Sequence, residues 1–312
     1  MTDLQATGVV ENVPVLDLSH TTWEEDLAGI DRIANVGAVV VPENLAHALA
    51  RISMQNVGAV VPIPTGAHVR VHTGTMTLGG DALADPGGDN EVLVVIGGLL
   101  ITSPLTRIGY REVIVIGTVL APRGSESVLG AGLTRMTGMV HYYRYAEGQQ
   151  LRPLTGQQTL SGSTLANQGG SPDDVLVVTG QTIVTGQVTA VGFQQIYYTG
   201  EVIVPRESES VLAPLLAGAG QLVWYDGSPR CFLGDETFGR GFFELVDEPL
   251  GLLLVGSFRI DDDVPAGLLR DKVTSISLVG SLAAPKELIP VVQLLATAKY
   301  GDISVAGDDA EH

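Results

Sequence analysis

Short apolar runs bounded by glycine or proline alternate with polar stretches along most of the chain. Examples are residues 196–205, 219–227 and 251–260, which are rich in Val, Ile and Leu. Continuous or alternating β-branched runs between turn residues are typical of β-strands. Successive runs lie about 20 residues apart, and the spacing lengthens to 26 from Ile196 to Leu222. The pattern predicts many short strands, some of them joined by helices.

A helix is expected after each proline that ends a strand. Proline has no N–H to donate to a sheet, and it is tolerated at the start of a helix. After Pro42, the apolar side chains of residues 45–52 fall on one helical face. After Pro122, either Ser125 or Ser127 is expected to be the N-cap of the helix.

The chain repeats itself. Residues 90–129 align without a gap with residues 173–212, a shift of 83 (173 − 90), and residues 73–84 align with 155–166 at a shift of 82. A fixed period of this kind is the signature of stacked repeat architectures. The shared repeat positions are Gly37, Gly117, Gly200, Gly280, Pro42, Pro122, Pro205 and Pro285.

This periodicity predicts a β-rich solenoid with short crossover helices, an α/β repeat with about three and a half copies of an 80-residue unit. The expected parts of this one continuous domain are an N-terminal cap at 1–32, repeat units at 33–112, 113–195 and 196–275, and a half repeat with a C-terminal cap and acidic tail at 276–312. Glycine between strands is expected to allow the corner, because glycine adopts positive φ at low cost. We therefore expect Gly200→Val to lower the melting temperature more than Gly218→Val.

Residues 273–307 combine a strand, a proline and an apolar helix-like stretch. This rhythm resembles that of leucine-rich repeats and of right-handed β-solenoids. The resemblance implies an elongated repeat architecture and no particular family or activity. It departs from leucine-rich repeats at Gly117, Gly200 and Gly280, where those repeats place an asparagine after the strand.

Charge and cysteine content narrow the expected partners and location. The chain has 17 Lys and Arg against 35 Asp and Glu, a net charge of −18, which disfavours nucleic acid and anionic membranes as partners. No apolar run approaches the roughly 18 residues of a membrane span, so membrane insertion is not expected. Its one cysteine excludes an intrachain disulfide, and the first residues lack a basic segment followed by an apolar run. A cytoplasmic protein is expected.

No catalytic residue, cofactor or metal site is predicted. The sequence has no GxxxxGK[ST], GxSxG or HExxH motif. His68 and His72 would lie about 13 Å apart along a strand, too far for one zinc ion. The run Asp261–Asp263 is interpreted as the acidic cap of the helix that follows it, in preference to a calcium site. Cys231 is interpreted as a buried structural thiol.

Aromatic residues offer a candidate binding face. Three pairs recur at a spacing of 82 or 83 residues: Tyr142 with Trp224, Tyr143 with Tyr225, and Tyr110 with Phe193. In a solenoid, equivalent positions line up along one face, where aromatic rings stack sugars or anchor a protein. Ordinary packing between neighbouring turns is the alternative.

We expect a non-enzymatic structural or scaffold protein that self-associates or assembles with protein partners. Each unit acts as a spacer, and the end of a solenoid presents unpaired strand edges. The alternative is a monomeric module that docks a protein or glycan on the aromatic face. A β-helix enzyme acting on polysaccharide is a third hypothesis, for which the sequence offers no identifiable pair of carboxylates.

Overall fold

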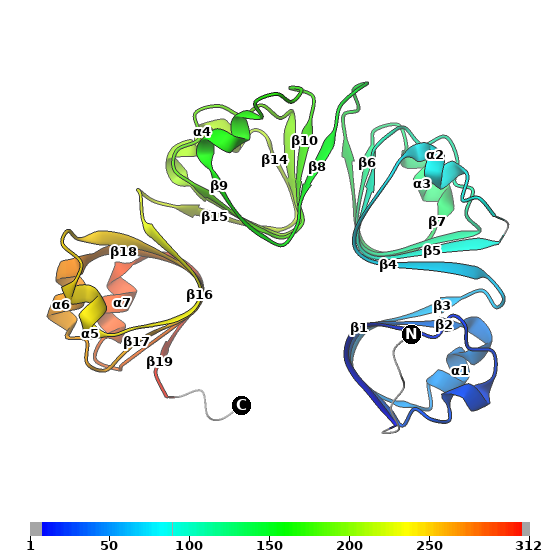
Figure 1. Cartoon of the computed structure of the whole chain (residues 1–312), viewed down its shortest axis with the longest axis horizontal. Coiled ribbons are helices and arrows are strands. Elements are labelled where there is room, and N and C mark those ends of the chain that lie inside the picture. The colour runs from blue at the N-terminus through cyan, green and yellow to red at the C-terminus, as the bar shows by residue number, and fades with distance from the viewer. Residues whose placement is uncertain (1–7, 89, 308–312) are drawn as a thin grey trace. The chain divides into compact units, whose positions relative to one another are not determined.

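The computed structural model describes residues 8–88 and 90–307 and divides the chain into two compact units, Met1–Leu151 and Arg152–His312. Each unit contains bent strands connected by short helices and loops (Figure 1). Within the described residues, no helix is long and apolar enough to cross a membrane. The start of the predicted N-terminal cap (1–7) and the predicted acidic tail (308–312) lie outside the described residues.

The first unit holds two groups of strands, which we call block 1 and block 2. Block 1 consists of β1 (Val9–Asp17), η1 (Glu24–Leu27), β2 (Arg32–Pro42), η2 (Glu43–Leu45), α1 (Ala46–Leu49) and β3 (Ser53–Ile63). Block 2 consists of β4 (His68–Leu78), α2 (Gly80–Ala84), β5 (Glu91–Ile101), β6 (Glu112–Pro122), α3 (Glu126–Gly132) and β7 (Leu133–Tyr143).

The second unit holds blocks 3 and 4. Block 3 begins at the unit boundary and consists of β8 (Leu151–Leu154), β9 (Gln157–Ser161), η3 (Gly162–Ala166), β10 (Val175–Val178), β11 (Gln181–Thr185), β12 (Gln195–Tyr198), β13 (Glu201–Pro205), η4 (Arg206–Ser208), α4 (Glu209–Leu212), β14 (Leu216–Gly218) and β15 (Gln221–Tyr225). Block 4 consists of β16 (Arg230–Phe238), α5 (Arg240–Glu244), β17 (Leu250–Ile260), α6 (Ala266–Lys272), β18 (Val273–Ala284), α7 (Ile289–Leu295) and β19 (Ala296–Val305).

The strands pair in parallel within each block. The sheet orders are β1-β2-β3, β4-β5-β6-β7, β8-β10-β12-β14, β9-β11-β13-β15 and β16-β17-β18-β19. Val71 lies opposite Val94, for example, and Val94 lies opposite Ile114. Parallel neighbours need a crossover connection, which the short helices and loops supply. The predicted strand-rich character is confirmed, and the strands predicted at 196–205, 219–227 and 251–260 are observed as β12–β13, β15 and β17.

Most of the long strands bend at a glycine that is in register with the glycines of its neighbours. The bends lie at Gly74, Gly97, Gly117 and Gly138 in block 2, and at Gly234, Gly256, Gly280 and Gly301 in block 4. At Gly117, φ is +138° and an added Cβ would lie 1.9 Å from the carbonyl oxygen of Gly97. Both the positive φ and the close approach require glycine there.

Block 1 bends at asparagine instead. Asn12, Asn35 and Asn56 have φ of 59°, 52° and 52°, a region that asparagine tolerates better than most residues. The Asn35 amide donates to Asn12 Oδ1 at 3.1 Å, and the Asn56 amide donates to Asn35 Oδ1 at 2.9 Å. The predicted repeat position Gly37 therefore lies two residues beyond the bend of its strand.

The four repeat prolines lie at strand ends. Pro42, Pro122 and Pro205 are the last residues of β2, β6 and β13, and Pro285 directly follows β18. The next element after each is a helix: η2, α3, η4 and α7, respectively. This order of strand, proline and helix follows from the missing N–H of proline.

The serine expected to cap α3 has a different role. Ser125 occupies the N-cap position, but its side chain makes no capping bond to the helix. Its hydroxyl instead accepts a hydrogen bond from the backbone nitrogen of Leu105 at 3.4 Å. Ser208 in block 3 likewise accepts from the nitrogen of Val188, at 2.8 Å. Each of these buried serines therefore forms a hydrogen bond between two successive connections of its block.

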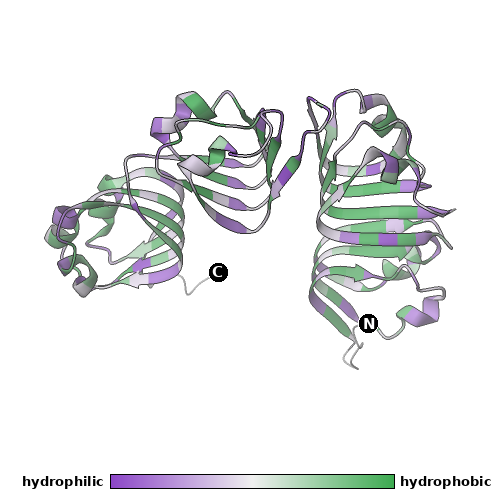
Figure 2. Cartoon of the chain, turned by 45° about the horizontal axis from the view of Figure 1, so that its top comes forward, coloured by the Kyte–Doolittle hydropathy of each residue, from purple (hydrophilic) through white to green (hydrophobic). Residues whose placement is uncertain are grey.

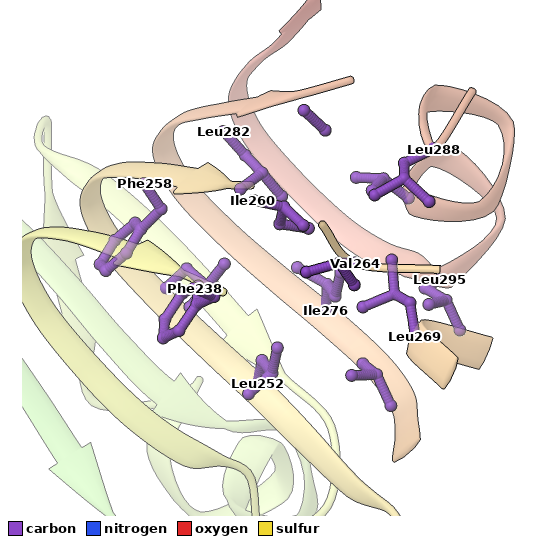
Figure 3. Packing of buried hydrophobic residues seen from close by; sticks show 14 of the residues in the cluster. Phe238, Leu252, Phe258, Ile260, Val264, Leu269, Ile276, Leu282, Leu288 and Leu295 are labelled. Carbon is purple, nitrogen blue, oxygen red and sulfur yellow. The ribbon is translucent and has the colours of Figure 1, made fainter. Parts of the chain in front are cut away.

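The inside of each block is filled by apolar side chains, and the strands are largely hydrophobic (Figure 2). In block 4, Phe258 and Leu282 from the strands share a core with Leu288 and Leu295 from the α7 region (Figure 3). The rings of Phe238 and Phe258 stack with centroids 5.9 Å apart. Burial of such side chains is the main stabilising term of each block.

The sheets do not begin and end at the predicted unit boundaries. The boundaries at 112/113, 195/196 and 275/276 lie within β6, β12 and β18, whereas the blocks are separated near residues 64–67, 144–150 and 226–229. A sequence period gives the length of a unit and leaves its starting residue open. The division into caps and repeat units within one continuous domain stays a prediction.

Candidate functional site

The six aromatic residues predicted to form a binding face do not share an exposed surface. Tyr143, Tyr225, Tyr110 and Phe193 are buried, with exposed fractions of 0, 3, 9 and 7%. Tyr142 and Trp224 are half-buried and pack against the cores of blocks 2 and 3. The expectation of an exposed aromatic face is thereby corrected, because these side chains recur at internal packing positions.

Tyr143 replaces a backbone hydrogen bond that a proline cannot make. Its hydroxyl donates to the carbonyl oxygen of Ile101 at 2.8 Å. Strands β4 and β5 show the backbone bond that is usual at this position. Leu78 lies opposite Ile101, and the carbonyl oxygen of Leu78 accepts from the nitrogen of Thr102, the residue after Ile101. Between β5 and β6, Leu100 lies opposite Leu120, so the carbonyl oxygen of Ile101 would accept from the backbone nitrogen of Pro122. That nitrogen carries no hydrogen. The tyrosine on the next strand supplies the missing donor.

Block 3 repeats this arrangement. Ile183 lies opposite Ile203, so the backbone donor to the carbonyl of Val184 would be the nitrogen of Pro205. The Tyr225 hydroxyl donates to that carbonyl at 2.8 Å instead. Desolvation by burial raises the pKa of both tyrosine hydroxyls, so each remains a protonated donor at neutral pH.

A buried acid pairs with an arginine at equivalent positions in blocks 2 and 3. In block 2, Glu91 is 8% exposed and its carboxylate lies 3.0 Å from Nε of Arg70. In block 3, Asp174 is 1% exposed and its carboxylate lies 3.0 Å from a terminal nitrogen of Arg152. The arginines are 82 residues apart (152 − 70) and the acids 83 (174 − 91). Sequence reasoning missed both pairs, although the repeat shift connects them.

These ion pairs anchor the loops that precede β5 and β10. Arg70 also donates to the carbonyl of Pro86 at 3.1 Å. The carboxylate of Asp174 also accepts from the side chain of Asn167 and from the nitrogen of Ser171, both at 3.2 Å. Such charge-assisted bonds satisfy a buried carboxylate, so this arrangement is structural in character.

His68 and His72 lie on β4 and have different neighbours. His68 Nδ1 lies 3.6 Å from a carboxylate oxygen of Glu91, and His72 lies opposite Val95 of the block 2 core. Over residues 8–88 and 90–307, no group of three or more His, Cys, Asp or Glu side chains is placed to hold a metal ion.

The run Asp261–Asp263 caps a different helix from the expected one. The backbone nitrogen of Arg240, the first residue of α5, donates to the carboxylate of Asp263 at 3.0 Å. The N-cap of α6, the helix that follows the run, is Pro265. The acidic residue therefore satisfies the helix start of the preceding connection.

Cys231 is less buried than the predicted structural thiol. It is half-buried and packs against the cluster formed between blocks 3 and 4. Burial raises the pKa of the thiol, which disfavours the reactive thiolate at neutral pH.

Neighbouring blocks within each unit pack sheet face against sheet face. Between blocks 1 and 2, the buried contact is made by Val40, Val61, Ile63, Val92, Val94 and Ile114. Between blocks 3 and 4, it is made by Ile183, Ile203, Val223, Tyr225, Leu253, Val255 and Val279. Apolar residues therefore mark the faces that meet another block.

The outer face formed by the second halves of the block 4 strands is polar by contrast. Its two rows are Asp235, Ser257, Ser281 and Asp302, and Thr237, Arg259, Ala283 and Ser304. All eight side chains are exposed or half-buried. Most of them line a shallow hollow of about 420 Å³. The outer face of block 1 is also polar, with Arg32 and Glu11 paired at 3.3 Å. Polar outer faces disfavour further face-to-face stacking.

Compared with known protein families, curated proteins and solved structures, the chain has no match. Its function has to be argued from its own residues.

Proposed function

We propose that the chain is a non-enzymatic β-solenoid repeat protein with a structural or scaffold role, which self-associates or assembles with protein partners. Recurring contacts support the repeat: Tyr143 and Tyr225 bond equivalent carbonyls, and Arg70 and Arg152 hold equivalent acids. Each contact recurs after 82 or 83 residues, close to the proposed unit of about 80.

The observation that carries this proposal is that, within residues 8–88 and 90–307, each sheet ends in open strand edges. The first and last strands of each sheet, such as β4 and β7 in block 2, have a neighbour in the sheet on one side. Their other side presents backbone donors and acceptors that can pair with a further strand. The polar outer faces of blocks 1 and 4 leave these edges as the better route to association.

Sedimentation velocity of the full chain, from about 1 to 100 μM, tests this proposal in the range of weak self-association. Salt near 0.15 M is needed, because a net charge of −18 repels a second copy at low ionic strength. We expect a mass that rises with concentration above the 32.6 kDa of one chain. Negative-stain electron microscopy then separates filaments from closed oligomers. A constant mass of one chain at every concentration would contradict self-association.

A further inference from the structure

Edge strands of the described sheets carry different protection against pairing with another chain. Native sheets protect their edges with proline, short strands or charged side chains that point into the core. β1 contains Pro14 and β3 contains Pro62. The edge strands of block 3, which are β8, β9, β14 and β15, are only three to five residues long.

Three of the long edge strands place a charge opposite the core. Each of these strands has a charged or titratable residue opposite a core residue of its neighbour. The pairs are Arg70 with Leu93 and His72 with Val95 for β4, Arg230 with Leu252 and Glu236 with Phe258 for β16, and Lys299 with Leu278 for β19. A further strand added at such an edge would bury that charge, which is costly.

Strand β7 has no such charge on the side of the block 2 core. Its Arg135 and His141 lie on the other side of the strand, opposite Ile114 and Leu120, and Arg135 donates to the carbonyl of Pro62 in block 1. Strand β7 is eleven residues long and contains no proline. Its inward side chains Met136, Val140 and Tyr142 are apolar and pack against the block 2 core. On the other side of the strand, Met139 is 45% exposed, the highest value for a large apolar residue within the described strands. An unprotected edge of this length is suited to pairing with another strand.

We propose that β7 of one copy pairs antiparallel with β7 of a second copy, about a two-fold axis at Gly138. The inference rests on the self-association proposed above and assigns it to one edge. In this register Met136 lies opposite the partner's Val140, on the core side. Thr137 lies opposite the partner's Met139, on the outer side. Antiparallel neighbours directly opposite each other share a face, so both contacts are complementary.

A two-fold arrangement fits this edge better than head-to-tail stacking. If β4 of a second copy continued the sheet beyond β7 with its bends in register, His72 would lie opposite Met136, and Arg70 would approach the core. On the core side, the two-fold pairing places apolar residues opposite apolar residues, and on the outer side it places Arg135 opposite the partner's His141. It also uses the same edge on both copies and closes after two chains.

Charge pairs at the outer positions test both the edge and the register. Sedimentation velocity compares the unmodified chain with two double variants, Thr137→Lys/Met139→Lys and Thr137→Glu/Met139→Lys. The first sets lysine opposite lysine across the two-fold axis, and the second sets glutamate opposite lysine. Thr137 and Met139 are exposed, so both variants should fold, and thermal unfolding confirms this. Tyr300→Lys on the protected edge β19, 38% exposed, is the matched control.

We expect the unmodified chain to reach the mass of two chains, about 65 kDa (2 × 32.6). The lysine–lysine variant should weaken the dimer at least tenfold, while the glutamate–lysine variant and Tyr300→Lys retain it. Equal dimerisation of both double variants would overturn the β7 pairing and leave self-association standing through another surface. A monomer at every concentration would overturn both the β7 pairing and self-association, and would leave the β7 edge open to a strand from a different protein.

Discussion

At the scale of single residues, Pro122 and Pro205 each leave a buried carbonyl without its backbone donor, and a tyrosine restores the bond. The two carbonyls belong to Ile101 and Val184. A buried acceptor without a partner costs more free energy than the hydrogen bond itself contributes. The two tyrosines are therefore structural residues, and their recurrence in the sequence follows from that of the prolines.

Removal of the hydroxyl tests this role. We expect Tyr143→Phe to lower the free energy of unfolding by about 1–3 kcal/mol, because the carbonyl of Ile101 then stays unpaired. Tyr300→Phe, at an exposed position, should change it by less than about 0.5 kcal/mol. Urea unfolding followed by circular dichroism measures both. Equal stability of the two variants would show that the Tyr143 hydrogen bond is unimportant.

The glycines of block 3 differ from expectation. Gly200 was expected to tolerate valine less well than Gly218. An added Cβ would lie 1.9 Å from a backbone carbonyl oxygen at either position, that of Gly180 for Gly200 and that of Tyr198 for Gly218. Close contact between neighbouring strands therefore restricts both sites, and the contrast between them disappears.

At the scale of elements, the long connections of blocks 2 and 3 are each held by a buried acid that pairs with a partly exposed arginine. The connection between η3 and β10 folds around the carboxylate of Asp174, which accepts hydrogen bonds from Arg152, Asn167 and Ser171. Asn167 itself has a positive φ of 49°. This loop is thus ordered by one side chain and has no helix or strand between Asn167 and Asp174.

Neutralising that carboxylate should loosen the connection. We expect Asp174→Asn to lower the free energy of unfolding by about 1.5–3 kcal/mol, the range for hydrogen bonds to charged groups. Glu209→Gln affects a surface pair with Arg206, where both side chains are about half exposed, and should have an effect below about 0.5 kcal/mol. Chemical denaturation gives the values, and hydrogen exchange across residues 167–174 shows whether the loss is local. Unchanged exchange there would argue against an anchoring role.

At the scale of the whole molecule, polarity distinguishes the sheet faces that meet another block from those that do not. The second half of block 3 presents Ile183, Ile203 and Val223 to block 4. The corresponding face of block 4 presents Ser257 and Ser281 among charged residues. The polar outer face of block 4 thereby limits the stacking of a further sheet on that block.

Making the outer face of block 4 apolar should remove this limit. We expect Ser257→Val/Ser281→Val to form species larger than those of the unmodified chain, because the new surface resembles the covered face of block 3. Gln293→Val, exposed on α7, should not do so. Light scattering after size-exclusion chromatography compares the masses. Identical masses for all three proteins would show that the polarity of this face does not control association.

The sequence predicts the strands, the order of strand, proline and helix, and the repeat spacing, because each depends on local patterns. The alignment could not show that Tyr143 is buried, because Tyr142 and Tyr143 recur together and the spacing is the same for inward and outward positions. It also could not show where one sheet ends. Residues 64–67 and 144–150 separate blocks, yet their composition resembles that of connections inside a block.

The tyrosine bond of block 2 also bears on the order of events during synthesis. The carbonyl of Ile101 emerges from the ribosome 42 residues before the hydroxyl that it pairs with. At bacterial or eukaryotic elongation rates this is a wait of roughly 2 to 8 s, long compared with the collapse of a chain. A nascent block 2 that ends at β6 therefore lacks one of its internal bonds, and β7 completes it. We expect protection of the nascent chain against proteases to rise in steps of whole blocks.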